Sequence, residues 1–378
     1  MTIYQQNGAR VASRNWFIAT IAAVMLGTSA TAASDDSQSH PMRFDRLSLD
    51  DGLSQSTVIS ILQDSRGLMW FGTENGLNSY NGYEFEQYLR ERGNPQALSN
   101  DFIYDVEEDS DGNLWIATNG GGLARMDRKT RKFESFRHDA GNPNSVSDNI
   151  IRTLLIDAEG IIWLGTRGAG LDRFDPQENQ FTHYRFNADD QQEQGANVIH
   201  KLYMDSSNAL WVGSNQGLGR LDLESQEFVY YKNNPDDAAT LSDERIRSIL
   251  EDSSGQLWVG TYGGGLNRFN KETGGFDHFR NDADDSSSIS NDRVTALYED
   301  SDQRLWVGTS RGLNLMDRER GTFTHHTHDQ SDSGSIGGDS ITTLYQDRGG
   351  MLWIGTLARG VSKWNPRTWS YGLKIHGH

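Results

Sequence analysis

The sequence predicts an all-β fold, a seven-bladed β-propeller made of four-stranded antiparallel blades. A Leu/Met/Ile-Trp phrase recurs every 45 to 48 residues, and a repeat of this length is typical of a propeller or a solenoid. An Asp stands six residues before each of these Trp. Gly is abundant at 40 residues and Pro is sparse at 6, which fits many short strands joined by tight turns. The seven Asp/Trp pairs are Asp64/Trp70, Asp109/Trp115, Asp157/Trp163, Asp205/Trp211, Asp252/Trp258, Asp300/Trp306 and Asp347/Trp353.

The fifth copy shows how each repeat divides into four strands. A first strand, 245–252, ends at the repeat Asp, and a tight Asp-Ser-x-Gly turn leads to a second strand, 257–261. A glycine loop then leads to a third strand, 265–269, and an outer strand follows at 276–280. Four strands joined in this way make one antiparallel blade. The turn favours Asp, whose side chain can bond nearby backbone N–H groups, and Gly, which accepts a positive φ.

Two copies lack the Gly of this turn. The fourth copy has Asn208 in its place and the sixth copy has Gln303. Asn tolerates the left-handed backbone region, whereas Gln does so poorly. We therefore expect the turn of the sixth copy to be of another type.

The Trp and the glycines around it are read as scaffold. The blade-centre strands are almost continuously apolar, because each blade is covered on both faces by its neighbours. We expect the repeat Trp to pack between blades, with a sugar-stacking platform as the alternative. Gly stands two residues after each Trp except at Ala117, which indicates close backbone approach between blades. The Gly-Gly-Gly run at 263–265 lacks the spacing of a phosphate loop and is interpreted as a structural turn.

The ring must be closed by a strand from one chain end, because an open seam would leave two unpaired edges. The seventh copy supplies three strands between about 340 and 364. Residues 43–48 precede the first copy as an outer strand would, so we predict closure by the N-terminal strand. The alternative is the segment TWSYGL at 368–373. The propeller is expected to span 43–366, with a tail at 367–378 and no second domain.

The N-terminus has the form of an export signal, expected at 1–32. Arg10 and Arg14 precede a short apolar run, and Ala30-Thr31-Ala32 has the small-x-small pattern of a cleavage site. An uncleaved inner-membrane anchor is the alternative. A disordered lead would follow at 33–42, and the mature protein would be periplasmic with no membrane span. The chain has no Cys and a net charge of −18, which argue against disulfides and against a nucleic-acid partner.

The repeat resembles a known family. Its pattern reads Ile-x-x-Ile/Leu-x-x-Asp-x-x-Gly-x-Leu-Trp-x-Gly-Thr-x-x-Gly-Gly-Leu-x-Arg-Phe, with linkers such as GNPNSVSDN, and resembles the two-component regulator propeller repeat over about residues 43–365. The resemblance implies a periplasmic sensor region of bacterial signalling proteins, such as hybrid histidine kinases that detect glycan fragments and membrane-bound diguanylate cyclases. Because no kinase or cyclase motif follows the repeats, output is expected from a missing or separate domain, with a membrane histidine kinase or diguanylate cyclase as partner.

A ligand site is expected on the rim that joins the loops after each second strand with the starts of the first strands. Residues at these positions vary between copies while the scaffold repeats, although solvated loop tips would vary in the same way. Several are Arg in an acidic chain, which favours an acidic ligand such as a uronate-containing oligosaccharide. The predicted ligand-binding residues are Glu74, Asn75, Asn119, Arg152, Arg167, His200, Asn215, Arg247, Tyr262, Arg293, Arg311 and Arg359.

We expect no catalysis, no cofactor and no metal. A propeller lyase of the streptogramin-inactivating type is the enzymatic alternative, and His200 is the single channel-side His that it could use. His325, His326 and His328 fall on an outer strand, away from the channel, where a metal site is conceivable. The stretch at 109–113 looks like the start of a calcium loop but is explained by the repeat turn. A third alternative is a non-catalytic protein-docking ring.

Overall fold

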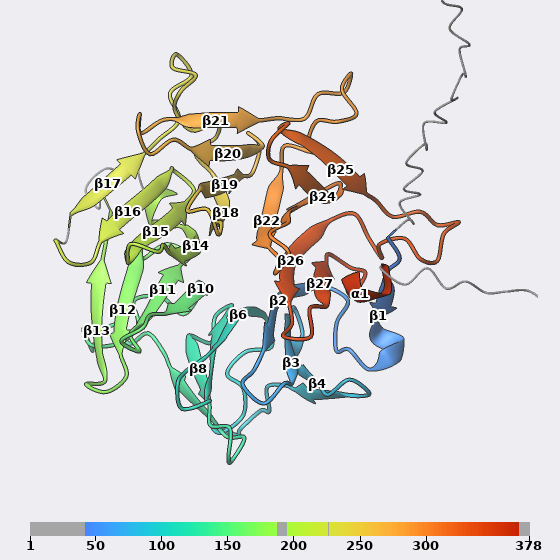
Figure 1. Cartoon of the computed structure of the whole chain (residues 1–378). Coiled ribbons are helices and arrows are strands. Elements are labelled where there is room, and N and C mark those ends of the chain that lie inside the picture. The colour runs from blue at the N-terminus through green and yellow to red at the C-terminus, as the bar shows by residue number, and fades with distance from the viewer. Residues whose placement is uncertain (1–41, 187–194, 226, 370–378) are drawn as a thin grey trace, which may run out of the picture. The chain divides into compact units, whose positions relative to one another are not determined.

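The computed structural model describes residues 42–186, 195–225 and 227–369, which belong to one compact unit. Their strands form seven four-stranded antiparallel sheets arranged around a central axis (Figure 1). The first strand of each sheet contacts the first strand of the next one, and β26 contacts β2, so the ring is complete. The predicted seven-bladed propeller is confirmed.

The strands follow one another in space as they do in the chain, except in the last blade. Blade 1 contains β2 (Val58–Gln63), β3 (Met69–Thr73), β4 (Gly76–Tyr80) and β5 (Phe85–Tyr88); blade 2 contains β6 (Ile103–Glu108), β7 (Leu114–Thr118), β8 (Leu123–Met126) and β9 (Phe133–Phe136); blade 3 contains β10 (Ile151–Ile156), β11 (Ile162–Thr166), β12 (Leu171–Asp175) and β13 (Gln180–Tyr184); blade 4 contains β14 (Ile199–Met204), β15 (Ala209–Ser214), β16 (Leu218–Asp222) and β17 (Phe228–Tyr231). Blade 5 contains β18 (Ile246–Glu251), β19 (Leu257–Thr261), β20 (Leu266–Phe269) and β21 (Phe276–Phe279); blade 6 contains β22 (Val294–Glu299), β23 (Leu305–Thr309), β24 (Gly312–Asp317) and β25 (Thr322–His326); blade 7 contains β26 (Ile341–Gln346), β27 (Leu352–Thr356), β28 (Val361–Trp364) and β1 (Asp45–Leu47).

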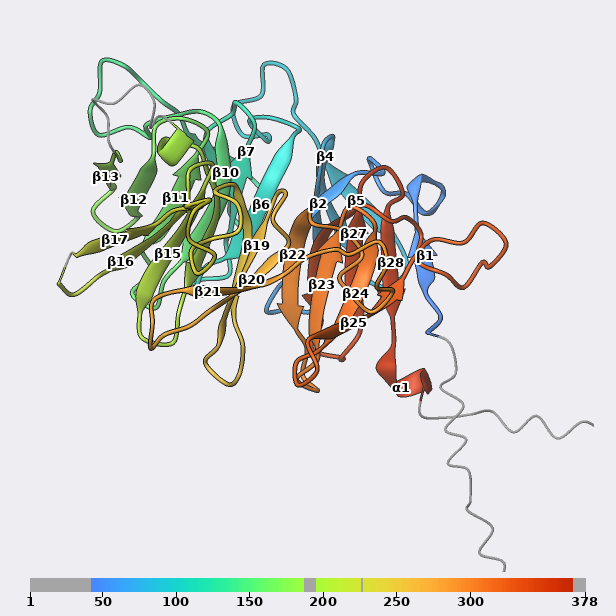
Figure 2. The ribbon, with the colours of Figure 1, turned by 90° about the horizontal axis from the view of Figure 1, so that it is seen from above.

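The N-terminal strand closes the ring, as predicted. β1 pairs antiparallel with β28, with Asp45 opposite Lys363 and Leu47 opposite Val361. Thr368 and Trp369 of the alternative segment lie in the short helix α1 (Pro366–Trp369), and the rest of that segment is outside the described residues. α1 and the start of β1 lie side by side (Figures 1 and 2). The expected signal at 1–32 and residues 33–41 are also outside the described residues.

Each repeat Asp organises its own turn. In the fifth copy, Asp252 Oδ1 accepts hydrogen bonds from the backbone N–H groups of Ser254 and Gln256 at 3.0 Å each. Its Oδ2 accepts from the Trp258 indole Nε1–H at 2.8 Å. The same indole-to-Asp bond is present in all seven copies, at 2.7 to 2.9 Å. One carboxylate therefore fixes both the turn and the orientation of the Trp.

The expectation of another turn type in the sixth copy is wrong. Gln303 takes the Gly position with φ +62°, and its N–H donates to the Asp300 carbonyl at 2.8 Å as in the other copies. The left-handed conformation costs about 1–2 kcal/mol for a residue with a side chain. Asp300 offsets this strain, because it also binds the Trp306 indole and the Arg304 guanidinium, both at 2.7 Å.

The repeat Trp packs between blades, as predicted. Trp70 of blade 1, for example, is buried against Val106, Leu114 and Met126 of blade 2. Trp353 of blade 7 packs in the same way on Phe71 of blade 1, with their ring centroids 5.7 Å apart. The indole therefore spans the boundary between two blades, which we call a seam and number by its blades, as in seam 1/2.

The glycines around the Trp bring backbones close together, as predicted. A Cβ at Gly260 would lie 2.5 Å from Val294 Cγ1 of the next blade and 2.2 Å from Ser248 Oγ. In the run at 263–265, a Cβ at Gly264 would lie 2.3 Å from Ser242 Oγ, and Gly265 has φ +79°. The Gly264 N–H donates to the Thr261 hydroxyl at 2.9 Å. The run is a structural turn.

Removal of the closing strand should destabilise the ring. A chain that starts at residue 49 loses the buried side chains of Phe44 and Leu47, each of which contributes about 1.5–3 kcal/mol. It also exposes the edge of β28. We expect thermal unfolding at a clearly lower Tm than for a chain that starts at residue 42. Equal Tm values for the two chains would contradict closure by β1.

Gly260→Ala should destabilise the chain by about 1–3 kcal/mol, because the methyl group has no room between blades 5 and 6. Gly168→Ala is the matched control, since a Cβ there meets no atom within 4 Å. Chemical denaturation measures both variants. A Gly260→Ala variant as stable as Gly168→Ala would show that the seam can relax.

Candidate functional site

A central channel runs between the first strands of the seven blades. Each first strand is bulged between its first and third residues where it pairs with the second strand. The strands enclose a cavity of about 390 Å³. The second residues of the seven strands line it: Ile59, Tyr104, Arg152, His200, Arg247, Thr295 and Thr342. A bulge re-aims a side chain, and here it places a strongly polar set on blades 3 to 5.

Arg152, His200 and Arg247 are joined by hydrogen bonds across three blades. Arg152 Nη1 donates to His200 Nδ1 at 2.8 Å, and His200 Nε2 donates to Asn215 Oδ1 at 2.9 Å. This pattern assigns the neutral Nε2–H tautomer to His200. Arg247 Nη2 donates to the same Asn215 oxygen at 3.1 Å. The network fixes both guanidinium groups at the channel mouth.

Tyr262 holds a second group of arginines beside this network. The guanidinium carbons of Arg293, Arg245 and Arg247 lie 4.1, 4.7 and 5.1 Å from the centroid of its ring. Arg245 is neutralised by a bidentate pair with Asp243, at 3.0 and 2.6 Å. The aromatic ring attracts the cations, and this attraction offsets part of the repulsion between them.

The network is cationic at neutral pH. Burial first, then Arg247 and Arg152, lower the pKa of His200 to about 3, so its imidazole is uncharged. Burial and the neighbouring arginines lower the pKa of Arg247 to about 10, which leaves it protonated. Among the described residues, no carboxylate forms an ion pair with Arg152, Arg247 or Arg293. Three positive charges therefore converge at the mouth, and none of the three forms an ion pair with a described carboxylate.

The structure brings together half of the predicted ligand-binding residues. Contacts connect six of them across blades 3 to 6: Arg152, His200, Asn215, Arg247, Tyr262 and Arg293. Arg167 is exposed and close enough to lower the pKa of Arg152. No hydrogen bond, ion pair or ring contact in the described parts of the chain joins the other five to this cluster: Glu74, Asn75, Asn119, Arg311 and Arg359. They lie on blades 1, 2, 6 and 7.

Three ionisable residues deeper in the channel were not predicted from the sequence. Asp105 accepts hydrogen bonds from the Thr153 hydroxyl and the Leu154 N–H of the next blade, at 3.1 and 3.2 Å. Lys201 and Glu107 line the same cavity. Burial first, then Asp105, raise the pKa of Glu107 to about 8, and Lys201 opposes this shift. The channel is thus basic at its mouth and carries mainly acidic side chains below.

The histidines at the end of β25 and just after it have structural contacts. His325 Nε2 contacts the Ser288 carbonyl at 2.6 Å, and His328 Nδ1 contacts the Ile336 carbonyl at 2.9 Å. His326 packs against Phe44 and Trp306, and burial lowers its pKa to about 4. In the parts of the chain that are described, no group of three or more His, Cys, Asp or Glu side chains could hold a metal ion.

Six segments of the chain match the two component regulator propeller family, at 52–75, 97–120, 145–168, 240–263, 288–311 and 335–358. These segments are two-component regulator propeller repeats. They fall in blades 1 to 3 and 5 to 7. None of the six segments falls in blade 4, which supplies His200, Lys201 and Asn215.

The chain is similar to sensor proteins over the propeller. The extracellular domain assigned to a hybrid two component system of B. thetaiotaomicron superposes with a TM-score of 0.73 at 25% identity, covering 86% of this chain and 42% of that one. A stretch of 46 residues is 52% identical to histidine kinase P4 of Formosa agariphila, which is 12% of this chain and 3% of the kinase. The chain thus spans less than half of these relatives.

Virginiamycin B lyase of Staphylococcus aureus shares the fold, with a TM-score of 0.62 at 16% identity, covering 86% of this chain and 99% of the lyase. A likeness at this level of identity shows the fold alone.

Within the described ranges, no helix is long and apolar enough to cross a membrane.

Glu107 should make stability depend on pH. Its pKa is about 8 in the folded chain and near 4.5 when unfolded, so the folded state binds the extra proton between these values. Stability from this group is complete at low pH and is lost as pH rises toward 8. Between about pH 5 and pH 8, the Tm of Glu107→Gln should fall by several degrees less than the Tm of the wild type. The exposed Glu178→Gln is the control, and parallel Tm profiles for all three proteins would refute the assignment.

Proposed function

We propose that this chain is the exported, periplasmic ligand-sensing propeller of a bacterial two-component or cyclic-di-GMP signalling system. Its ligand is an anionic small molecule of the acidic oligosaccharide class, bound at the channel mouth. Output comes from a separate domain or partner, a membrane histidine kinase or diguanylate cyclase. The repeats and the likeness to extracellular sensor domains support the signalling role.

The observation that carries the ligand class is the convergence of Arg152, Arg247 and Arg293 without a carboxylate partner. A guanidinium binds a carboxylate through two parallel hydrogen bonds. Because the chain has a net charge of −18, its overall field repels anions. A local cluster of positive charge is therefore needed to bind one. Burial strengthens such contacts because the local dielectric is low.

The remaining groups of the mouth suit the neutral part of an oligosaccharide. Asn215 already accepts from both His200 and Arg247, and its amide NH₂ is a donor for a sugar hydroxyl. Tyr104 lines the channel beside Arg152, whose guanidinium carbon lies 6.0 Å from the Tyr104 ring centroid. Aromatic edges and fixed amides are the usual specificity groups of concave ligand sites.

The test is isothermal titration with an oligouronate and with a neutral oligosaccharide of the same length. We expect the oligouronate to bind and Arg247→Ala or Arg293→Ala to weaken it about tenfold, the loss of one charge-assisted contact. Arg320→Ala is the control, because Arg320 pairs with Asp317 on the exposed surface. Equal binding of the neutral sugar, or affinity unchanged in both Arg variants with unchanged Tm, would overturn the proposal.

A further inference from the structure

The turns on the rim opposite the mouth connect neighbouring blades. In five of the seven seams, the residue after the repeat Asp donates its backbone N–H to a side-chain oxygen of the next blade. The accepting residue is the last one of that blade's first strand. These contacts are Ser65 to Glu108 at 2.6 Å, Ser206 to Glu251 at 2.6 Å, Ser253 to Glu299 at 2.5 Å, Ser301 to Gln346 at 2.8 Å and Arg348 to Gln63 at 2.9 Å. Each contact bridges one seam.

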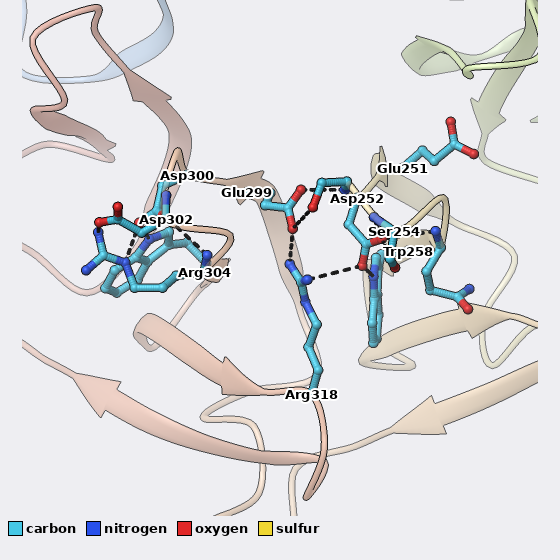
Figure 3. A network of polar contacts seen from close by, with 12 residues as sticks. Glu251, Asp252, Ser254, Trp258, Glu299, Asp300, Asp302, Arg304 and Arg318 are labelled. Carbon is cyan, nitrogen blue, oxygen red and sulfur yellow. Dashed lines mark hydrogen bonds and ion pairs between the residues drawn. The ribbon is translucent and has the colours of Figure 1, made fainter.

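Two of these seams also bind an arginine of the next blade, whereas in seam 6/7 the repeat Asp300 binds Arg304 of its own blade at 2.7 Å. In seam 5/6, Arg318 lies between Glu299 and Asp252, at 2.5 and 3.6 Å, beside Trp258 (Figure 3). In seam 1/2, Arg128 contacts Asp64 at 2.7 Å, and its guanidinium carbon lies 5.3 Å from the Trp70 ring centroid. A guanidinium on the repeat Asp and near the repeat Trp is therefore a recurring arrangement of this fold.

Seam 3/4 keeps the repeat Asp of this arrangement, Asp157, but has neither the cation nor the facing glutamate. The position of Arg128 and Arg318 is Leu223, the turn residue is Ala158, and the facing strand residue is Met204. A cavity of about 550 Å³ lies there, and four acidic residues are among those that line it: Asp157, Glu159, Asp175 and Glu224. Seam 2/3 also lacks the cation, since Pro176 stands at this position, but there the Asn113 amide donates to Asp109 at 3.1 Å.

Arg173 is the single cation among the residues that line this cavity. Its counterpart in blade 5 is Arg268, because each stands opposite the repeat Trp in the strand pairing. Arg268 turns away to Asp277 at 2.8 Å and leaves Asp252 to Arg318. In blade 5, an arginine at this position therefore coexists with a second guanidinium on the repeat Asp, whereas in blade 3 the residue opposite Arg173 is Thr182 instead of an Asp.

We propose that the seam 3/4 cavity binds an arginine side chain of a partner polypeptide. The incoming guanidinium takes the place at Asp157 that Arg128 and Arg318 fill in their own seams. Trp163, Tyr184 and Leu223 line the cavity and offer apolar surface to the arginine stem. Charge complementarity favours a cation, because four acidic residues and one basic residue line the cavity. The site lies beyond the end of β10 opposite to Arg152, so it does not depend on the proposed ligand at the mouth.

The probe is Nα-acetyl-arginine amide, titrated into the folded chain and followed by NMR of the Trp indole N–H groups. The citrulline analogue, which has the same shape without charge, is the matched control. We expect saturable shifts in the millimolar range that include the Trp163 signal for the arginine probe alone. No saturable shift, or equal shifts with the citrulline probe, would overturn the proposal.

Two variants locate the site. Leu223→Arg should supply the missing guanidinium from the chain itself, raise Tm and abolish binding of the probe. Glu159→Gln combined with Glu224→Gln should weaken binding about threefold or more, since exposed charges contribute modestly. Glu319→Gln, the counterpart of Glu224 in blade 6, should have no effect. Probe binding that persists unchanged in both Leu223→Arg and the double variant would place the arginine elsewhere and refute the assignment.

Discussion

The hydrogen bond from the Trp indole to the repeat Asp is the interaction on which the rest of the structure depends. The same carboxylate accepts backbone N–H groups of its turn, so one side chain fixes the end of the first strand and the position of the indole. The indole then packs on the next blade, and the glycine two residues later lets that blade approach. Repeated seven times and closed by β1, this unit holds the first strands around the channel.

Because the scaffold is repeated, differences between blades carry the specific properties of the chain. The second residue of each first strand faces the channel in every blade, and it is Arg, His and Arg in blades 3, 4 and 5. At the other end of the same strands, seams that share the repeat Asp differ in whether a cation binds it. At the mouth, Arg152, Arg247 and Arg293 form no ion pair with a described carboxylate, whereas acidic residues predominate among the charged residues that line the seam 3/4 cavity. The two rims of the same propeller thus carry opposite charges.

The sequence predicted the blades, the closing strand and the packing of the Trp, because each depends on a register that is visible in seven copies. It did not predict the indole-to-Asp bond, since the turn alone explained the Asp. It was wrong about Gln303, because the strain of a positive φ is offset by contacts that a local pattern does not show. Arg152 and Arg247 were correctly placed on one rim, but Glu107 and Lys201 were missed. The strand bulge decides which side chains face the channel, and no residue pattern marks it.

The ligand site proposed for this chain is the mouth formed by blades 3 to 6. Hydrogen–deuterium exchange of the chain with and without a saturating oligouronate tests it most directly, because protection maps the contact without any substitution. The account predicts slower exchange at 199–200, 215–217, 246–247 and 262–264, and unchanged exchange in the loops of blades 1, 2 and 7. Protection centred on Glu74, Asn119 or Arg359, with none around Tyr262, would contradict it.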